Sequence, residues 1–259
     1  MDMRLILPEV CTKRKSKLWR FTPDFIFFTM NFYRAEVGRG GKFSTCRLLG
    51  KLKTCRHKLF AKEPNIGMKI VHYPHPSLRH PGKPLNAIDK KVRLLVGEML
   101  DLMYEAKGLG LAAPQVCLPY QLLVMNASAD PEQRDQEGIY INPVILERHG
   151  SVEGEEGCLS FPGLYGKVRR AKTVTVRAYD LQGRSFDVTR TELPGRVLQH
   201  EIDHLQGSLF IDKMGSVAKL SARGAIQEFE RDYKKAQERG DIPPETEIEQ
   251  LLTALETGA

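Results

Sequence analysis

The segment His200-Glu201-Ile202-Asp203-His204 holds the residues with the clearest chemical potential. Residues four apart lie on the same face of an α-helix, so His200 and His204 can bind one metal ion. Glu201 then lies beside the metal without binding it and can act as a general base. The alternative is an amphipathic helix with two surface histidines. The metal site is favoured, because chance gives this pattern in about one chain in a hundred.

A catalytic metal site needs a third protein ligand and one open position. Downstream of His204 the chain has no histidine, and its first acid is Asp212. Upstream, the segment Glu156-Gly157-Cys158-Leu159-Ser160 offers a thiolate next to a glycine. Cys158 can therefore be a metal ligand. Two other interpretations stay open: a small buried apolar residue, or a nucleophile paired with His200.

A third element is the segment Gly108-Leu109-Gly110-Leu111-Ala112-Ala113-Pro114-Gln115. Its small residues allow another backbone to approach closely, and Gln115 offers an amide donor. It is not a phosphate-binding loop, because no Lys-Ser/Thr follows it and no strand is predicted before it. Taken alone, the segment favours a glycine C-cap and a tight turn after a helix over a binding role.

The elements that must position these residues follow from hydrophobic periodicity. A helix is predicted from an N-cap at Asn86 to about Ala106, a second from Pro194 to Gly207, and a third over 217–238. Strands are predicted over 121–126 and 139–146, with a hairpin from Val174 that turns at 180–183. Strands and helices do not alternate strictly. We therefore expect an α+β fold, with antiparallel strands packed around the central His-Glu-x-x-His helix and with a C-terminal helix.

Charge divides the 259 residues into two unlike parts. Residues 1–67 hold 15 Lys+Arg and 5 Asp+Glu, a net charge of +10, whereas residues 68–259 carry −3. We expect 1–67 to be a disordered basic extension, either an organelle presequence or a segment that is not translated, with the true start at Met68. Residues 68–240 then form the catalytic domain, and 241–259 a flexible tail.

Composition also bounds the cellular setting. No run of eighteen apolar residues exists, which argues against an integral membrane protein. The main body is mildly acidic, so no specific nucleic-acid partner is expected for it. Five cysteines without regular spacing make a poor disulfide framework and favour a reducing compartment.

The three motifs together, in this order, resemble those of the peptide deformylases. The segments read GLGLAAPQ, EGCLS and QHEIDHLQG, and the likeness runs from about Met68 to Met214. Members of this family remove the formyl group from the N-terminal formyl-methionine of newly synthesised polypeptides and release formate. The resemblance implies nascent formyl-methionyl chains at the ribosome as substrates and a cytoplasmic location, or an organelle matrix if residues 1–67 are a presequence.

The resemblance also implies the metal centre. Cys158, His200 and His204 would bind one divalent metal, Fe²⁺ first, with Zn²⁺ or Ni²⁺ possible. The metal would lower the pKa of a bound water from about 15.7 towards neutrality. Glu201 would take the proton and later pass it to the leaving amine.

Further residues acquire roles from the same resemblance. The side-chain amide of Gln115 and the backbone N–H of Leu159 would stabilise the formyl oxygen as it gains charge. The backbone at Leu109, Gly110 and Gly157 would pair with the extended substrate peptide as an added strand.

Supporting residues can be predicted around this centre. Arg170 matches a family position expected to pair with Glu156, although it could also be a solvated arginine. Asp203 is predicted to be a structural ion-pair partner. Val197 and Leu198 are candidates to line the pocket for the methionine side chain.

Two other function classes remain possible at this point. A zinc endopeptidase shares His-Glu-x-x-His, but the candidate cysteine ligand and the glycine-rich segment argue against it. A non-catalytic metal or nucleic-acid binding module is suggested by the basic extension, and it would need a closed four-ligand site.

Overall fold

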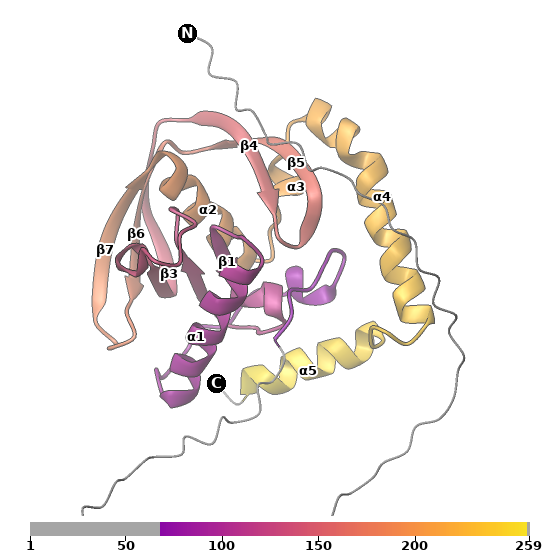
Figure 1. The fold of residues 1–259 in the computed structure, drawn as a ribbon, viewed down its shortest axis with the longest axis horizontal. Helices are drawn as coiled ribbons and strands as arrows, with labels where there is room; N and C mark the ends of the chain where they lie inside the picture. The colour runs from indigo at the N-terminus through magenta and orange to yellow at the C-terminus, as the bar shows by residue number, and fades with distance from the viewer. Residues whose placement is uncertain (1–67, 258–259) are drawn as a thin grey trace, which may run out of the picture. The chain divides into compact units, whose positions relative to one another are not determined.

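The computed structural model describes residues 68–257, and the predictions for 1–67 lie outside the described residues. Its main sheet has five strands in the order β1-β2-β3-β6-β7, and every neighbouring pair is antiparallel. A separate two-stranded sheet contains β4 and β5 (Figure 1). The strands are β1 (Gly110–Ala112), β2 (Leu122–Met125), β3 (Gly138–His149), β4 (Val152–Cys158), β5 (Phe161–Arg170), β6 (Thr173–Tyr179) and β7 (Ser185–Thr191).

Helices complete the α+β fold, which confirms the predicted fold class. Helix α2 carries the His-Glu-x-x-His motif and lies among the strands, with close contacts to β1, β2, β6 and β7. The α-helices are α1 (Lys90–Glu105), α2 (Glu192–Leu205), α3 (Phe210–Lys213), α4 (Ser216–Glu238) and α5 (Glu245–Thr257). Single 3-10 turns occur at η1 (Pro76–Leu78), η2 (Ala113–Val116) and η3 (Arg134–Gln136).

Helix α1 starts three residues later than predicted. The N-cap is Asp89, whose side chain accepts a hydrogen bond of 2.9 Å from the backbone N–H of Val92. Asn86 and Asp89 are both good capping residues, and periodicity alone does not choose between them. The buried face contains Val92, Val96 and Met99, which pack on the inner side of β1 and β2.

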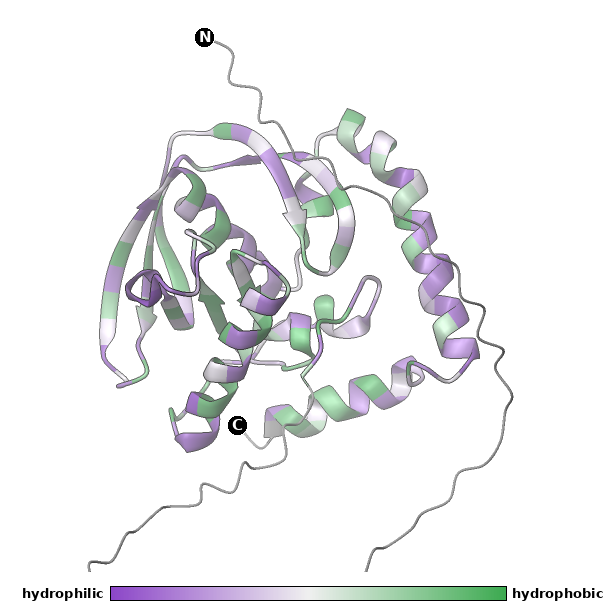
Figure 2. Ribbon diagram, in the orientation of Figure 1, coloured by the Kyte–Doolittle hydropathy of each residue, from purple (hydrophilic) through white to green (hydrophobic). Residues whose placement is uncertain are grey.

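Helix α2 is buried on nearly all sides, because apolar residues face the sheet and the polar ones face the site. Its buried residues include Leu198 and Ile202, which pack against β2 and β6. Figure 2 shows the hydrophobic colouring of the sheet strands that face this helix. A buried helix is a rigid support, so side chains that leave it towards a cavity are held in place.

The expected flexible tail over 241–259 is corrected by the structure. Residues Glu245–Thr257 form α5, with Ile248 and Leu252 buried one turn apart. Each such burial contributes about 1.5–3 kcal/mol. The Oη atom of Tyr120 donates to the carbonyl of Leu255, and His80 pairs with Glu256 at 2.7 Å. Pro243-Pro244 thus precedes a docked helix, and only 258–259 lie outside the described residues here.

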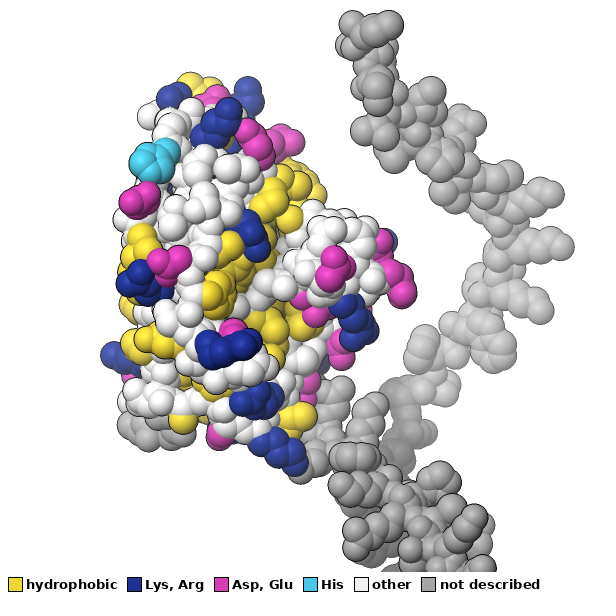
Figure 3. Space-filling view, turned by 90° about the vertical axis from the view of Figure 1, so that its left-hand side faces the viewer, with side chains coloured by type: hydrophobic (Ala, Val, Ile, Leu, Met, Phe, Trp, Pro, Cys, Tyr) yellow, Lys and Arg dark blue, Asp and Glu magenta, His cyan; other side chains and the backbone are white. Residues whose placement is uncertain are grey.

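Among residues 68–257, no helix combines the length and the apolar character that crossing a bilayer would require. On the face of the molecule drawn in Figure 3, acidic and basic side chains alternate with apolar ones. Neither sign of charge dominates this face.

Candidate active site

The predicted metal ligands come together from two elements. Cys158 is the last residue of β4, whereas His200 and His204 lie one turn apart on α2. One donor atom from each of the three lies within 4.8 Å of the other two. The Cys158 Sγ atom is 3.3 Å from Nε2 of His204. Both imidazoles are buried, and the thiol is partly exposed towards the cavity.

These residues fit a divalent transition metal. A thiolate and two imidazoles are the donors of catalytic zinc and iron sites with an open position. The Nδ1 atom of His200 donates to Oε2 of Glu156 at 3.1 Å, which leaves its other ring nitrogen for a metal. Burial lowers the pKa of His204 strongly, so this ring is neutral and able to bind a metal.

The pKa of His200 is shifted in the opposite direction to that of His204. Burial alone lowers the pKa of His200, but hydrogen bonds with Cys158 and Glu156 outweigh burial and raise the pKa to about 10. Without a metal, these two acceptors therefore favour the protonated ring, and a bound cation would take the place of the proton.

Glu201 lies between the glycine-rich segment and the ligands. Its side chain is buried, and among the described residues its Oε2 atom has no hydrogen-bond partner. Burial raises the pKa of Glu201 to about 7, against the opposing charges of His200 and Arg170. A Cβ atom at Gly110 would lie 2.6 Å from Oε1 of Glu201, so glycine at this position leaves the space in which the carboxylate lies.

Gln115 is positioned by η2 and β1. Its Oε1 atom accepts a hydrogen bond of 2.8 Å from the backbone N–H of Ala112. This contact turns the Nε2 atom towards Ser160 Oγ at 3.3 Å and Cys158 Sγ at 3.4 Å. The segment predicted as a tight turn forms the edge strand β1 and then η2. This arrangement places the Gln115 amide next to the Cys158 thiol.

The site opens into a cavity of about 680 Å³. The predicted residues Leu109, Gly110, Gly157 and Leu159 all line this cavity, together with Val197. Leu198 does not, because it faces the core behind α2. Tyr165 is a lining residue that the sequence reasoning missed; a Cβ at Gly157 would lie 2.6 Å from its ring.

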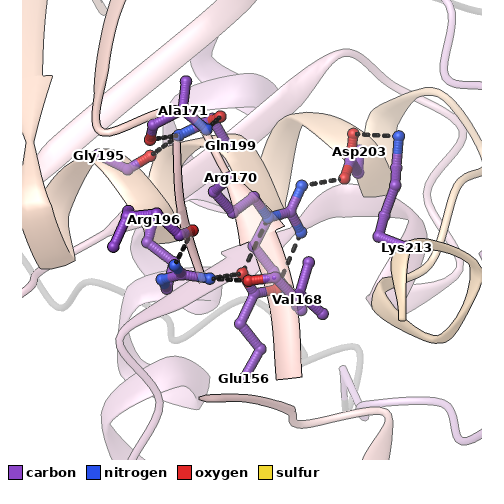
Figure 4. A network of polar contacts seen from close by, with 11 residues as sticks. Glu156, Val168, Arg170, Ala171, Gly195, Arg196, Gln199, Asp203 and Lys213 are labelled. Carbon is purple, nitrogen blue, oxygen red and sulfur yellow. Dashed lines mark hydrogen bonds and ion pairs between the residues drawn. The ribbon is translucent and has the colours of Figure 1, made fainter. Parts of the chain in front are cut away.

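A buried charge network supports the ligands (Figure 4). The Nε and Nη2 atoms of Arg170 donate to the two oxygens of Glu156 at 2.8 and 2.9 Å. Arg170 also pairs with Asp203, so both supporting contacts that the sequence predicted are present. Burial alone would raise the pKa of Glu156, but the hydrogen bonds from Arg170 and His200 hold it well below its usual range.

Comparison with known proteins agrees with this geometry. The family model described as polypeptide deformylase matches residues 68–220. The chain belongs to the peptide deformylase family. Peptide deformylases are metal-dependent hydrolases, and this enzyme removes the formyl group from the N-terminal formyl-methionine of newly synthesised polypeptides and releases formate.

Individual deformylases show the extent of the likeness. The chain is 42% identical over 183 residues to the peptide deformylase of Rhodopirellula baltica, covering 71% of this chain and 90% of that one. It is 39% identical to the chloroplastic/mitochondrial peptide deformylase 1B of Arabidopsis thaliana, covering 70% and 66%. A crystal structure of the Plasmodium falciparum peptide deformylase matches with a TM-score of 0.63 and 42% identity, covering 64% of this chain and 98% of that chain.

Proposed function

We propose that this deformylase works with Cys158, His200 and His204 as the ligands of its metal and with Glu201 as its proton carrier. The main observation in support is that three possible metal-donor atoms lie within 4.8 Å of one another, beside the buried carboxylate of Glu201. A divalent ion held by these three residues would lower the pKa of water and act as a Lewis acid towards the formyl oxygen. Loss of formate release when the metal is removed tests the proposal.

Glu201 would move the proton in two steps. Its carboxylate accepts a proton as water attacks the formyl carbon, and it returns the proton to the leaving amine. Amide hydrolysis needs this return, because an amide anion is a poor leaving group. The raised pKa of about 7 supports the proposal, because a group that both takes and gives a proton works best near the ambient pH.

Gln115 and Leu159 would stabilise the charge that develops on the formyl oxygen. The Gln115 amide reaches the immediate surroundings of Cys158, and Leu159 follows the cysteine directly. The hydrogen bond from the backbone N–H of Ala112 holds the Gln115 side chain in place, so its amide costs little reorganisation during the reaction.

The substrate peptide would lie along β1. This strand is at the edge of the five-stranded sheet, and Leu109, Gly110 and Gly157 border the cavity beside it. An extended peptide can add to such an edge through main-chain hydrogen bonds. Val197 would form part of the wall around the methionine side chain.

Gln115→Ala is expected to lower kcat by about 10²–10³, the typical loss for one oxyanion donor, with unchanged metal content. Steady-state formate release and elemental analysis measure the two quantities. Gln121→Ala, on a partly buried residue just before β2 and outside the cavity lining, serves as the control. A kcat within a factor of about two of the parent would refute a role for Gln115 in the transition state.

Iron is the metal that we propose for the native enzyme, with zinc or nickel as the alternatives that the same donors accept. The soft thiolate and the imidazoles suit all three ions. Elemental analysis of the protein purified without oxygen distinguishes them.

The cellular setting follows the same proposal. The substrates would be nascent formyl-methionyl chains that emerge from the ribosome, in the cytoplasm or, if residues 1–67 are a presequence, in an organelle matrix. The name of the Arabidopsis relative, chloroplastic/mitochondrial, supports the second location, and bacterial relatives such as that of Rhodopirellula support the first.

Residues 68–259 are expected to form the complete working enzyme. The family match starts at residue 68, and every proposed site residue lies within the described range. A protein of residues 68–259 should match the full chain in kcat/KM and thermal midpoint. The intact mass of the native protein shows where it begins. A shortened protein that is insoluble, or slower by an order of magnitude, would show that the first 67 residues belong to the working fold.

A further inference from the structure

The metal ligands depend on how the β4–β5 hairpin is attached to α2. Among the described strands, β4 and β5 form a sheet of their own, and β5 has in addition only an isolated bridge between Val168 and Met214. A two-stranded hairpin needs packing against other elements to be stable in water, and apolar residues of β5 supply it against α3 and α4. Because Cys158 ends β4 while both histidines lie on α2, the contacts between these elements determine how close the thiol lies to the imidazoles.

Arg196, one turn before His200 on α2, reaches both strands of this hairpin (Figure 4). Its Nη1 atom donates to Oε1 of Glu156 at 2.7 Å and to the carbonyl of Val168 at 3.0 Å. Its Nη2 atom donates to the carbonyl of Val152 at 3.0 Å. One guanidinium thus joins the helix to β4 at two points and to β5 at a third, with only 12% of its side chain exposed.

The hairpin has a matching space for this side chain. A Cβ atom at Gly154 would lie 2.8 Å from Nη2 of Arg196 and 2.9 Å from its central carbon. Real Cβ atoms do not approach that closely, so a side chain at residue 154 would force the guanidinium to shift from its place on β4.

We propose that Arg196 is a positioning residue that fastens the β4–β5 hairpin to α2 and presets the distance between the Cys158 thiol and the two imidazoles. The inference rests on the ligand set proposed above. Through Glu156 the same guanidinium also fixes the carboxylate that orients His200. Further links remain between the hairpin and α2: Arg170 on β5 pairs with Asp203, and Gln199 bonds the backbone of Ala171 just after β5. Loss of Arg196 therefore weakens the attachment without removing it.

The first test measures how tightly the full-length enzyme holds zinc. The zinc-loaded parent and Arg196→Ala are titrated with a chromophoric chelator, and circular dichroism shows whether each variant is folded. Loss of a residue that supports metal ligands costs about 10–100-fold in metal affinity, and we expect that loss for Arg196→Ala. Arg177→Ala removes an exposed arginine that bonds Asp187 across the β6–β7 hairpin, and it should hold zinc as the parent does.

A second variant, Gly154→Ala, disturbs the contact between Arg196 and β4 without removing the arginine. In Gly154→Ala the new methyl group displaces the guanidinium, so zinc affinity should fall as in Arg196→Ala. In the double variant the glycine substitution should add little, because both changes break one contact. Arg196→Lys should recover part of the affinity, since lysine can pair with Glu156 but lacks the planar fork that reaches the two carbonyls.

The outcomes separate this inference from the proposed function. A folded Arg196→Ala with the zinc affinity of the parent would overturn the positioning role alone, as would additive losses in the double variant. If Arg196→Ala does not fold, Gly154→Ala and Arg196→Lys decide by the same measurement. If Cys158→Ala holds zinc as tightly as the parent, the ligand set itself is wrong and the positioning role falls with it.

Discussion

Glu201→Gln is expected to lower kcat for deformylation by about 10²–10⁴ while the metal content stays near that of the parent. Glutamine keeps the shape of the side chain against Gly110 but cannot accept the proton that leaves the attacking water. The carboxylate is buried, so bulk solvent cannot replace it as a base. Formate release and elemental analysis on the same preparation measure the two effects.

The control for this variant is Glu192→Gln, at the exposed start of the same helix. This substitution removes one negative charge from α2, as Glu201→Gln does, and it should leave kcat unaltered. An active Glu201→Gln enzyme would refute the proton-carrier role. A variant that loses its metal would show instead that Glu201 is a ligand.

Cys158→Ala is expected to lose most of the bound metal and essentially all activity. Two imidazoles alone leave the site one donor short, and a catalytic site needs three. Cys117→Ser, at the other cysteine among the described residues, should keep both the metal and the activity. Elemental analysis after gel filtration gives the metal content.

Two results would contradict the ligand role of Cys158. Stoichiometric, tightly bound metal in the purified variant would exclude the thiolate as a ligand. Activity of the parent after exhaustive metal removal would favour the other interpretation, in which Cys158 is a nucleophile paired with His200.

More of the candidate site than of the structure that supports it could be predicted from the sequence. That His200 and His204 share one face of a helix follows from their spacing, which local sequence determines. The ligand role of Cys158 was predicted through the family resemblance. The β4–β5 hairpin that carries Cys158 was not predicted, since Glu153 to Gly157 contains two glycines and three acids and lacks the alternation of a strand. The ion pair of Arg170 with Glu156 was predicted from the family resemblance rather than from spacing.

Other features depend on tertiary contacts that have no local signal. Arg196 reads as one more charged residue on a helix, and its role is apparent only where three acceptors of the hairpin surround it. Pro243-Pro244 suggests a loose tail after it, yet the spacing of Ile248 and Leu252 is a local signal for helix α5. Gly154 could not be distinguished from other glycines, because the side chain that needs its space lies 42 residues away.

Formate release from formyl-Met-Ala-Ser by the full chain, with and without a chelator, tests the central claim most directly. The account predicts one formate for each free methionine amine produced, loss of this activity with the chelator, and its return when Fe²⁺ or Zn²⁺ is added. Cleavage of the internal peptide bonds, or formate release that persists after complete metal removal, would contradict it.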